Sequence, residues 1–416
     1  MTRRSDTMTH RTYSIRDVYF WIIVFSLFLA SFFILASLYM VQPLMPVFVD
    51  VFGVSVSSSS LTLSLTVIGM IIGLTINGYL SDRLGRTIFI KLSLVGAIIP
   101  FIVTPIFNSF SVLLVFRLVQ GFALAGLPAA ALAYIAEEID RKGMGLATAF
   151  YIASNALGGM AGRFVTGYLV DQHSWQMTFY LWAGVGIVIL IMILFLLPSS
   201  RFFRPIHTPF KKDLRAYAEH LKNPVLLLFF LLGIVLQLSF TGVWTYLPFY
   251  LQNEPFYLSL QNISFFYLAY GLGVMGSSVA GILINHFELS RIRTIAICIM
   301  TVGIVITFYQ TVYAVAIGLC LICLGFFTAH SLTATSVTMT ATHHKGSASS
   351  LYLASYYIGV TLGSTMFAPV WEKTEWIGLI TIASIIPVAL MIFQHIFMKK
   401  VRMKEQTNSK SIHKHN

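Results

Sequence analysis

Twelve stretches of about 20 mostly apolar residues recur along the chain, separated by short polar segments. A helix of this length crosses the hydrocarbon core of a bilayer, where backbone polar groups must bond within their own segment. A β-barrel would instead alternate apolar and polar residues over roughly ten positions, and these stretches are too long and continuous for that. We therefore expect an all-α integral membrane protein with twelve transmembrane helices, near residues 20–47, 59–80, 88–107, 110–136, 144–170, 175–197, 224–250, 259–285, 292–309, 312–340, 346–369 and 376–397.

The composition supports a membrane protein and excludes several other classes. Of the 416 residues, 57% are hydrophobic and only 10% are charged, whereas soluble proteins carry roughly 25% charged residues. This balance excludes a cytosolic enzyme, a secreted disulfide scaffold and a disordered chain. We expect the protein to lie in the cell membrane (plasma or inner membrane) as a multi-pass protein.

The lysines and arginines indicate the orientation of the chain. With the N-terminus inside, 24 of the 27 basic residues fall in segments that the predicted topology places in the cytoplasm. Positive charge in short loops is typical of the cytoplasmic side, so we expect both termini there. The net charge of +12 then reflects topology, and we expect no binding of nucleic acid.

The first apolar stretch follows a polar, arginine-containing segment, as the core of a signal peptide does. Its apolar run is longer than such a core, and no small-x-small cleavage site follows it. We therefore expect this stretch to be the first membrane helix rather than a cleaved leader.

The longest polar segment between spans divides the helices six and six. The two halves also share an internal repeat, because residues 145–175 shifted by 201 positions give eight identities in 31 positions with 346–376. The predicted organisation is a cytoplasmic N-terminal tail (1–19), an N-terminal six-helix bundle (20–198), a cytoplasmic linker (199–223), a C-terminal six-helix bundle (224–397) and a cytoplasmic basic tail (398–416). Two similar bundles in parallel repeat are the architecture of a transporter whose bundles rock around a shared substrate site.

Short motifs strengthen this interpretation. The run Gly78-Tyr-Leu-Ser-Asp82-Arg83-Leu-Gly85-Arg86 is similar to motif A of the major facilitator superfamily, and Arg117-x-x-Gln120-Gly121 resembles its motif B. Further runs, among them Ser349-Ser-Leu-Tyr-Leu-Ala-Ser-Tyr-Tyr-Ile-Gly359, resemble the YnfM-type bacterial exporters. The resemblance covers nearly the whole chain and implies two six-helix bundles of the major facilitator fold.

The motif A resemblance implies a charge cluster that gates the cytoplasmic side. We expect the glycines Gly78 and Gly85 to allow close helix approach and a tight turn. The charged residues Asp82, Arg83 and Arg86 would pair there with an acid at the end of the fourth span. The residues assigned to this gating motif are Gly78, Asp82, Arg83, Gly85, Arg86, Glu137 and Glu138. The alternative is an ordinary solvated loop.

Glycines four residues apart in the two repeat-equivalent spans predict helix packing. Gly158 and Gly162 in one half match Gly359 and Gly363 in the other. Small residues at this spacing let helix backbones approach closely in a membrane. Antiporters of the superfamily often carry a proline in this region. This sequence has the glycines without the proline, so the motif suggests antiport but does not show it.

Ionisable residues deep in a membrane are costly and usually mark a functional site. None of the acids lies deep in a predicted span, but Arg117 and Arg163 do. Because arginine stays charged and binds carboxylates in bidentate fashion, this pair predicts an anionic or zwitterionic substrate. The substrate-binding residues that we predict are Arg117, Arg163, Tyr39, Asn155, Trp244 and Tyr356. The alternative for Arg117 is a structural role, bonded to backbone carbonyls or to Gln120.

His330 is the ionisable residue that we expect deep in the C-terminal half. Histidine changes charge near neutral pH, which suits a proton carrier, so we assign His330 to proton coupling. The alternative is a neutral histidine bonded to Ser331 or to a backbone carbonyl.

The sequence favours a carrier over an enzyme or a receptor. It has no intramembrane acid pair, zinc-protease motif or ATP-binding loop, and no segment long enough for a soluble output domain. The family resemblance implies a secondary active, proton-coupled exporter, with a small-molecule substrate, protons and membrane lipid as partners and no cofactor or metal. It is expected to function as a monomer. Within the YnfM-like group, exporters of opine-type metallophores such as staphylopine suit the two arginines; the alternative is a broad-spectrum drug or sugar exporter.

Overall fold

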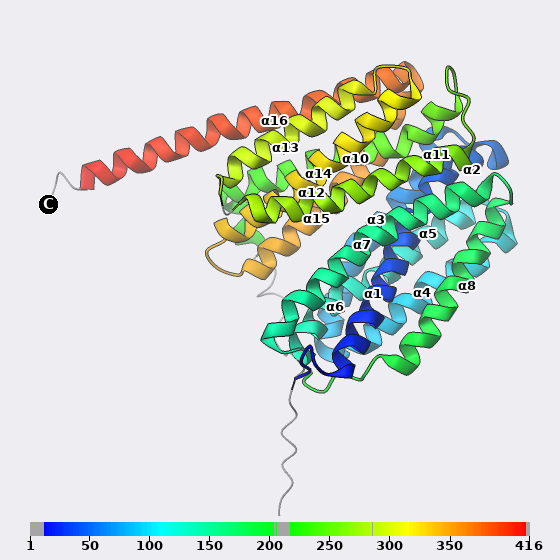
Figure 1. Ribbon diagram of the computed structural model, residues 1–416, viewed down its shortest axis with the longest axis horizontal. Helices are drawn as coiled ribbons and strands as arrows, with labels where there is room; N and C mark the ends of the chain where they lie inside the picture. Colours follow the sequence, from blue (N-terminus) through cyan, green and yellow to red (C-terminus); the bar gives the residue numbers. More distant parts are fainter. Residues whose placement is uncertain (1–11, 204, 206–216, 285, 413–416) are drawn as a thin grey trace, which may run out of the picture. The chain divides into compact units, whose positions relative to one another are not determined.

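The computed structural model describes residues 12–203, 205, 217–284 and 286–412 of the chain (Figure 1). These residues are almost entirely helical, and the described part contains no β-strand beyond one isolated bridge between Tyr13 and Ile139. The all-α prediction is therefore confirmed. Most of the predicted N-terminal tail and much of the predicted linker lie outside the described residues.

The first half of the chain forms a series of long helices joined by short turns. The elements are α1 (Val18–Tyr39), the 3-10 turn η1 (Gln42–Leu44), α2 (Met45–Phe52), α3 (Val56–Leu84), α4 (Arg86–Phe107), α5 (Phe110–Leu124), α6 (Gly126–Glu138), α7 (Arg141–Val170) and α8 (Trp175–Leu196).

The second half follows the same plan. Its elements are α10 (Pro224–Gln252), α11 (Leu260–Ser264), the 3-10 turn η2 (Phe265–Ala269), α12 (Tyr270–Leu283), α13 (Leu289–Ile306), α14 (Val312–Thr340), α15 (Lys345–Thr365) and α16 (Ala368–Ile412). Helix α16 continues well beyond the predicted end of the last span at residue 397, into the segment that the sequence predicted as a tail.

Every predicted span corresponds to a helix, but several are interrupted where the sequence analysis expected a continuous run. The first span ends at Tyr39, and η1 with Pro43 precedes α2 with Pro46. Proline lacks the backbone donor that a helix interior requires, which explains the interruption. The fourth span is divided between α5 and α6, and the eighth contains η2. The non-helical residue Glu375 in α16 lies in the predicted break directly before the last span.

Ten helical segments of the described chain are long and apolar enough to cross a membrane. The predicted spans at 144–170 and 346–369 form α7 and α15 but are not among these ten. Both helices are rich in glycine, serine and other small residues, which lowers their hydropathy. These two helices carry the internal repeat, and small residues of this kind let helix backbones approach closely in a membrane.

The repeated glycines lie where helix backbones approach each other. A Cβ added at Gly162 would lie 2.5 Å from the carbonyl oxygen of Ala36 in α1, and Gly158 lies against the carbonyl of Phe32 in the same helix. In the second half, a Cβ at Gly359 would lie 2.5 Å from the carbonyl oxygen of Ile234 in α10. Gly363 meets α10 in the same way, 2.5 Å from the carbonyl oxygen of Leu238. The predicted packing role of these glycines is confirmed in both halves.

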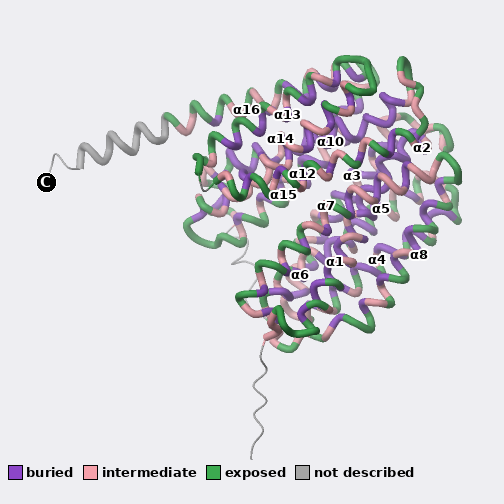
Figure 2. Tube along the Cα trace, in the orientation of Figure 1, coloured by how far each residue is buried: buried purple, intermediate pink, exposed green. Residues whose placement is uncertain are grey.

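The chain divides into two compact units. One contains residues 1–39, 69–162 and 176–208; the other contains 40–68, 163–175 and 209–416. Helices α3 and α7 each pass from one unit into the other. Helix α10, in the second unit, is buried over most of its length, whereas exposed residues recur along α16 (Figure 2). The predicted six-plus-six division of the helices stays a prediction.

The α10–α15 contact gives a test of the packing. We expect Gly359→Ala to destabilise the protein by about 1–3 kcal/mol, because the added methyl group overlaps the α10 backbone. Gly346→Ala, in the same helix, is the matched control, since a Cβ there meets nothing within 4 Å. Size-exclusion chromatography of detergent-solubilised protein after heating measures both variants. Equal melting temperatures would contradict the packing role of Gly359.

Candidate functional site

A row of aromatic side chains crosses the second unit and connects four of its elements. Trp244 of α10 stacks on Tyr267 of η2 with ring centroids 5.3 Å apart, and it lies 4.8 Å from Tyr270 of α12. Phe240, one turn before Trp244, contacts Tyr270 at 5.5 Å and stacks on Phe326 of α14 at 3.9 Å. We call these residues, together with His330 of α14 and Tyr352 and Tyr356 of α15, the aromatic row.

His330 continues the aromatic row on α14. Its ring stacks on Phe326 with centroids 5.7 Å apart and on Tyr352 of α15 at 5.4 Å. Tyr356, one turn after Tyr352, is half-buried and lies 5.0 Å from the imidazole. The row therefore extends from Tyr267 to Tyr356 through α10, α12, α14 and α15, and it includes Trp244, His330 and Tyr356 of the predicted site.

Arg163 of α7 lies at the first end of the row. Its guanidinium carbon is 4.6 Å from the ring centroid of Tyr270, and the side chain is only 3% exposed. Its Nε donates a hydrogen bond to Oε1 of Gln42, whose Nε2 donates to Oγ1 of Thr245 in α10 at 2.9 Å. The buried cation is thus oriented by η1 on one side and by an aromatic face on the other, a favourable arrangement for a cation.

Two buried donors of the aromatic row, on rings that neighbour or stack beside Tyr270, have no hydrogen-bond partner in the part of the chain that the structure describes. These are Nε1 of Trp244 and the hydroxyl of Tyr267, and both side chains are fully buried. Indole N–H is a donor only, and leaving a buried donor unsatisfied is costly. A guanidinium and two unsatisfied donors together form a site that suits a ligand rich in acceptors.

His330 is bonded to Tyr352 rather than to Ser331, the partner that the sequence analysis named in its alternative. The Tyr352 hydroxyl lies 3.1 Å from the backbone oxygen of His330 and 2.9 Å from its Nδ1. When the single hydroxyl proton is donated to the backbone oxygen, Nδ1 must carry a hydrogen to complete the second bond. The other ring nitrogen, Nε2, is then the atom that can accept a proton.

Arg117 is placed differently from Arg163. It lies in the first unit, is 1% exposed, and donates to the carbonyl oxygens of Ser37 at 3.0 Å and Leu38 at 2.8 Å, as well as to Oε1 of Gln120 at 2.5 Å. Ser37 and Leu38 are at the C-terminal end of α1, where carbonyl groups lack helical partners. These contacts are those of the structural alternative for Arg117.

Two further residues of the predicted substrate site belong to the first unit. Tyr39 is the last residue of α1 and is buried. Asn155 of α7 is half-buried, and its Oδ1 accepts a hydrogen bond from the hydroxyl of Ser31 in α1. Tyr39, Asn155 and Arg117 therefore belong to the first unit, whereas the residues of the aromatic row belong to the second.

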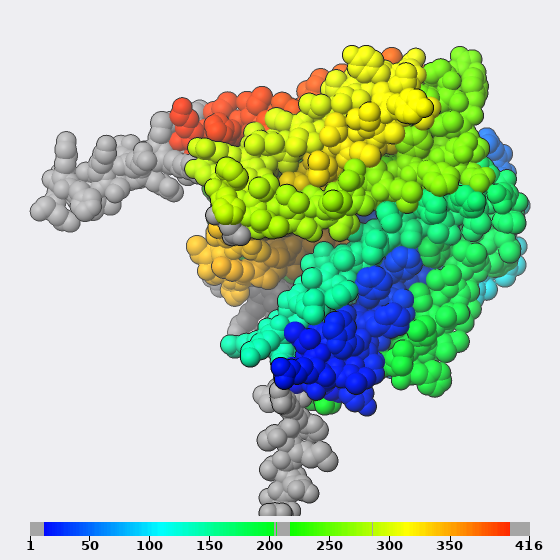
Figure 3. Space-filling view, in the orientation of Figure 1, coloured from blue at the N-terminus to red at the C-terminus, as the bar shows by residue number. Residues whose placement is uncertain are grey.

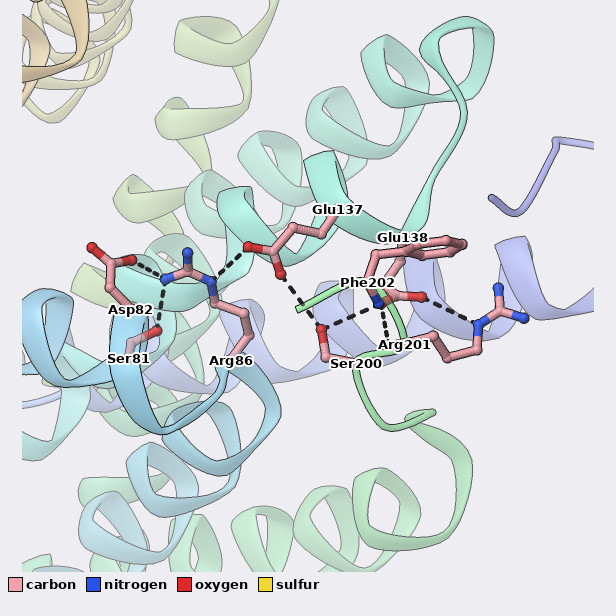
Figure 4. Close-up of polar contacts among 8 residues, drawn as sticks. All are labelled: Ser81, Asp82, Arg86, Glu137, Glu138, Ser200, Arg201 and Phe202. Carbon is pink, nitrogen blue, oxygen red and sulfur yellow. Dashed lines mark hydrogen bonds and ion pairs between the residues drawn. The ribbon is translucent and has the colours of Figure 1, made fainter. Parts of the chain in front are cut away.

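Motif A lies at the turn between α3 and α4, and its central residue is Arg86 (Figure 4). Arg86 is 4% exposed, and its guanidinium bonds the carboxylate of Asp82, the hydroxyl of Ser81 at 3.2 Å and Oε1 of Glu137 at 3.0 Å. Glu137 lies near the end of α6, so the arginine ties this helix to the α3–α4 turn.

The other motif A residues contribute to different degrees. Gly85 adopts a φ of 113°, which favours glycine, and it permits the turn. A Cβ at Gly78 would meet nothing within 4 Å, so the expected close helix approach at Gly78 is not observed. Gly73 provides it instead, since a Cβ there would lie 2.5 Å from the carbonyl oxygen of Phe122 in α5. Arg83 packs over the ring of Tyr79, 3.5 Å from the centroid.

Glu138 extends the charge cluster to the segment that follows α8. Its carboxylate is fully buried and accepts hydrogen bonds from the backbone N–H groups of Arg201 at 2.5 Å and Phe202 at 3.0 Å. Ser200 donates to both acids, at 3.5 Å to Glu137 and 3.3 Å to Glu138 (Figure 4). The beginning of the predicted linker is therefore bonded directly to the motif A cluster.

Several of these partners were not predicted from the sequence. Gln42 and Tyr352 determine the orientation of Arg163 and His330, yet neither was named as a site residue. A signal was present for both, because Gln42 directly precedes a proline that interrupts a span, and Tyr352 is the repeat equivalent of Tyr151. The role of Ser200 had no signal, since it depends on where the chain folds after α8.

Comparison with known proteins agrees with this architecture. Residues 27–364 match the model of the Major Facilitator Superfamily. The chain is 37% identical over 357 residues to an uncharacterized transporter of Buchnera aphidicola subsp. Schizaphis graminum, covering 86% of each chain. It is 30% identical to the inner membrane transport protein YnfM of Escherichia coli K12, covering 89% of this chain and 88% of that protein.

More distant matches complete the comparison. A multidrug resistance protein MdtG of Citrobacter koseri is 27% identical, over 52% of this chain and 54% of its own length. The crystal structure of a D-xylose-proton symporter superposes with a TM-score of 0.75 at 15% identity, covering 90% of this chain and 97% of that one. This last likeness concerns the fold. With its helices, its motif A cluster and its matched relatives, the chain belongs to the Major Facilitator Superfamily of membrane transporters.

Proposed function

We propose that this transporter exports a small anionic or zwitterionic metabolite, which it binds at Arg163 and the adjoining end of the aromatic row. The observation that carries the proposal is a pair of unsatisfied buried donors, Trp244 Nε1 and the Tyr267 hydroxyl, on stacked rings, with the buried guanidinium packed over Tyr270, which Trp244 also contacts. A carboxylate offers acceptors only and forms charge-assisted hydrogen bonds with arginine, so it complements all three groups.

The apolar rings of the aromatic row suggest that the ligand also has an apolar portion. Phe240 and Phe326 offer flat apolar faces beside the donor-rich end. A ligand with carboxylates and an aromatic or aliphatic portion would use both parts. An opine-type metallophore such as staphylopine, with several carboxylates, is the specific ligand that we propose.

Proton antiport at His330 is the proposed energy source. Nε2 of His330 is the protonation site that the Tyr352 contacts leave available, and histidine changes charge near neutral pH. The aromatic row connects this imidazole through Phe326 and Phe240 to Tyr270, on which Arg163 packs. Protonation of His330 would place a second positive charge on the row that also includes the ligand site.

The motif A cluster is the proposed gate. Arg86 joins α3 and α4 to α6, and Glu138 fixes the segment after α8. Movement of these elements relative to one another during transport must therefore break charge-assisted hydrogen bonds, which are roughly twice as strong as neutral ones. We expect the cluster to control the rate of the conformational cycle more than ligand affinity.

The second candidate is a broad-spectrum drug exporter. It is favoured by the multidrug resistance relative and by the aromatic row, which suits flat apolar ligands. A sugar exporter remains the third possibility raised by the sequence. The buried arginine beside unsatisfied donors favours the anionic ligand over both.

Cells that lack the protein provide the direct test of substrate class. We expect a carboxylate-rich metabolite to shift from medium to cytosol on deletion, and the wild-type gene to restore export. The Arg163→Gln variant should restore it at least about tenfold less well, because a charge-assisted bond contributes roughly 1.5–3 kcal/mol. Untargeted mass spectrometry of medium and cytosol measures both effects.

Arg117→Gln is the contrasting variant in this test. Because Arg117 bonds the α1 carbonyls, its replacement should lower the amount of folded protein rather than export per molecule. A cytosolic build-up of cationic drugs with no change in any anion would contradict the proposal and favour the drug exporter. Full export by a folded Arg163→Gln variant would contradict the role of Arg163.

His330→Gln tests proton coupling. The variant retains a side chain of similar size but cannot change charge, so we expect transport into proteoliposomes to lose its dependence on a pH gradient. Tyr352→Phe is the control, since it removes the hydrogen-bonding hydroxyl but keeps the imidazole, and it should remain dependent on the gradient. An unchanged response in His330→Gln would remove the coupling assignment.

Asp82→Asn and Glu138→Ala test the gate. We expect both to lower the maximum transport rate several-fold with little change in the half-saturating ligand concentration, because each loses charge-assisted bonds in the cluster. Asp17→Asn is the control, since Asp17 is an exposed acid whose side chain, among the described residues, bonds only the Ser14 amide of its own turn. Wild-type turnover in both gate variants would show that the cluster does not control cycling.

A further inference from the structure

A cavity of about 930 Å³ lies among the first turn of α13, the last turns of α14 and the middle of α16. Helices α13 and α16 lie side by side in the second unit, coloured yellow and orange to red in Figure 3. The basic residues among its lining are Arg291, Arg293, His395 and Lys399, and the acid is Glu288. It is separate from the aromatic row and from the motif A cluster.

Arg293 is the central residue of this cavity. It is 9% exposed, donates to the hydroxyl of Ser336 at 2.6 Å, and packs over Phe229 with its guanidinium carbon 5.0 Å from the ring centroid. Among the described residues no carboxylate lies within ion-pair distance of it. The lining acid, Glu288, pairs at 3.0 Å with Arg291, and that pair is exposed. A buried arginine with spare donors and no counter-ion favours an anion in the cavity.

Gln394 provides a second, independent indication of a ligand. It lines the same cavity from α16 and is 5% exposed, yet its Nε2 has no hydrogen-bond partner in the described structure. An amide N–H₂ that is buried and unpaired is costly. Arg293 and Gln394 thus present donors from two helices to one space.

An apolar groove adjoins the cavity. It has a volume of about 280 Å³, shares Thr294 and Ile295 with the cavity, and continues along α13 past Cys298 to Val302. From Thr294 to Val302 the helix rises by roughly 12 Å. The groove therefore leads from a basic site near the end of the membrane span toward its middle, between α13 and Leu321 of α14.

We propose that this cavity binds the phosphate of an anionic phospholipid, with an acyl chain in the adjoining groove. Arg293 and Gln394 would donate to the phosphate oxygens, and Lys399 would add positive charge at the rim. Basic pockets between membrane helices on the cytoplasmic side are suited to such headgroups, and this end of α13 is predicted to be cytoplasmic. Free phosphate has the same charged oxygens as the headgroup, but it has no apolar part that would occupy the groove.

Native mass spectrometry of the purified full-length protein in dodecyl maltoside tests the proposal. Phosphatidylglycerol is the probe, phosphatidylcholine is the lipid control, and inorganic phosphate is added as competitor. We expect the wild-type protein to bind phosphatidylglycerol in preference to phosphatidylcholine, and millimolar phosphate to leave this binding unchanged. Arg293→Gln should weaken it about tenfold.

Arg291→Gln is the matched control, because this arginine lies on the same helix but is exposed and paired with Glu288. It should change the affinity less than twofold. Since Arg293 also bonds Ser336 and packs on Phe229, Gln394→Leu is a second variant with little effect on folding, expected to weaken binding roughly threefold.

Three results would overturn the proposal. The first is equal binding of the two lipids by the wild-type protein, and the second is an unchanged affinity for phosphatidylglycerol in both Arg293→Gln and Gln394→Leu. The third is displacement of phosphatidylglycerol by inorganic phosphate. The last would assign the cavity to a soluble phosphate instead of a lipid. None of these results bears on the export of an anion at Arg163, which the metabolite measurement tests separately.

Discussion

Close backbone contact between helices at glycine residues is the interaction on which both halves of this protein depend. In lipid there is little hydrophobic force between helices, so contact requires small residues that let backbones meet. Gly158 and Gly162 bring α7 against α1, and Gly359 and Gly363 bring α15 against α10. The residues of the candidate site are placed by these contacts, since Arg163 directly follows Gly162 and Tyr356 lies one turn before Gly359.

The two buried arginines show how the same side chain serves different purposes according to what lies beside it. Arg117 donates to the last carbonyls of α1, which a helix end leaves without partners, and to Gln120. Arg163 packs over the ring of Tyr270, which also contacts Trp244, and its Nε donates to the side chain of Gln42. Depth in a membrane span identifies both as unusual, but only the neighbours distinguish a structural arginine from one that can bind a ligand.

Much of the fold could be predicted from the sequence because it depends on local properties. Apolar length located the helices, and the glycine repeat between 145–175 and 346–376 identified two helices whose backbones closely approach a neighbouring helix. The interruptions at η1 and η2 and the extension of α16 to Ile412 were missed. Motif A predicted an acid partner for Arg86 at the end of α6, where Glu137 lies. The role of Glu138 in holding Arg201 and Phe202 was not predictable, because it joins segments more than 60 residues apart.

The hydrogen bond between Arg163 and Gln42 has a consequence for selectivity. Because Nε of Arg163 already donates to a neutral amide oxygen, a ligand that uses this nitrogen must exchange one acceptor for another. For a hydroxyl or an amide the exchange brings almost no net gain, whereas a carboxylate gains because the acceptor then also carries a charge, opposite to that of arginine. Gln42 thus competes with the ligand for Nε of Arg163, and only an acceptor stronger than a neutral amide oxygen gains by displacing it. The same exchange would also release Gln42 from its orientation toward Thr245. Ligand binding would thereby change a hydrogen bond to α10.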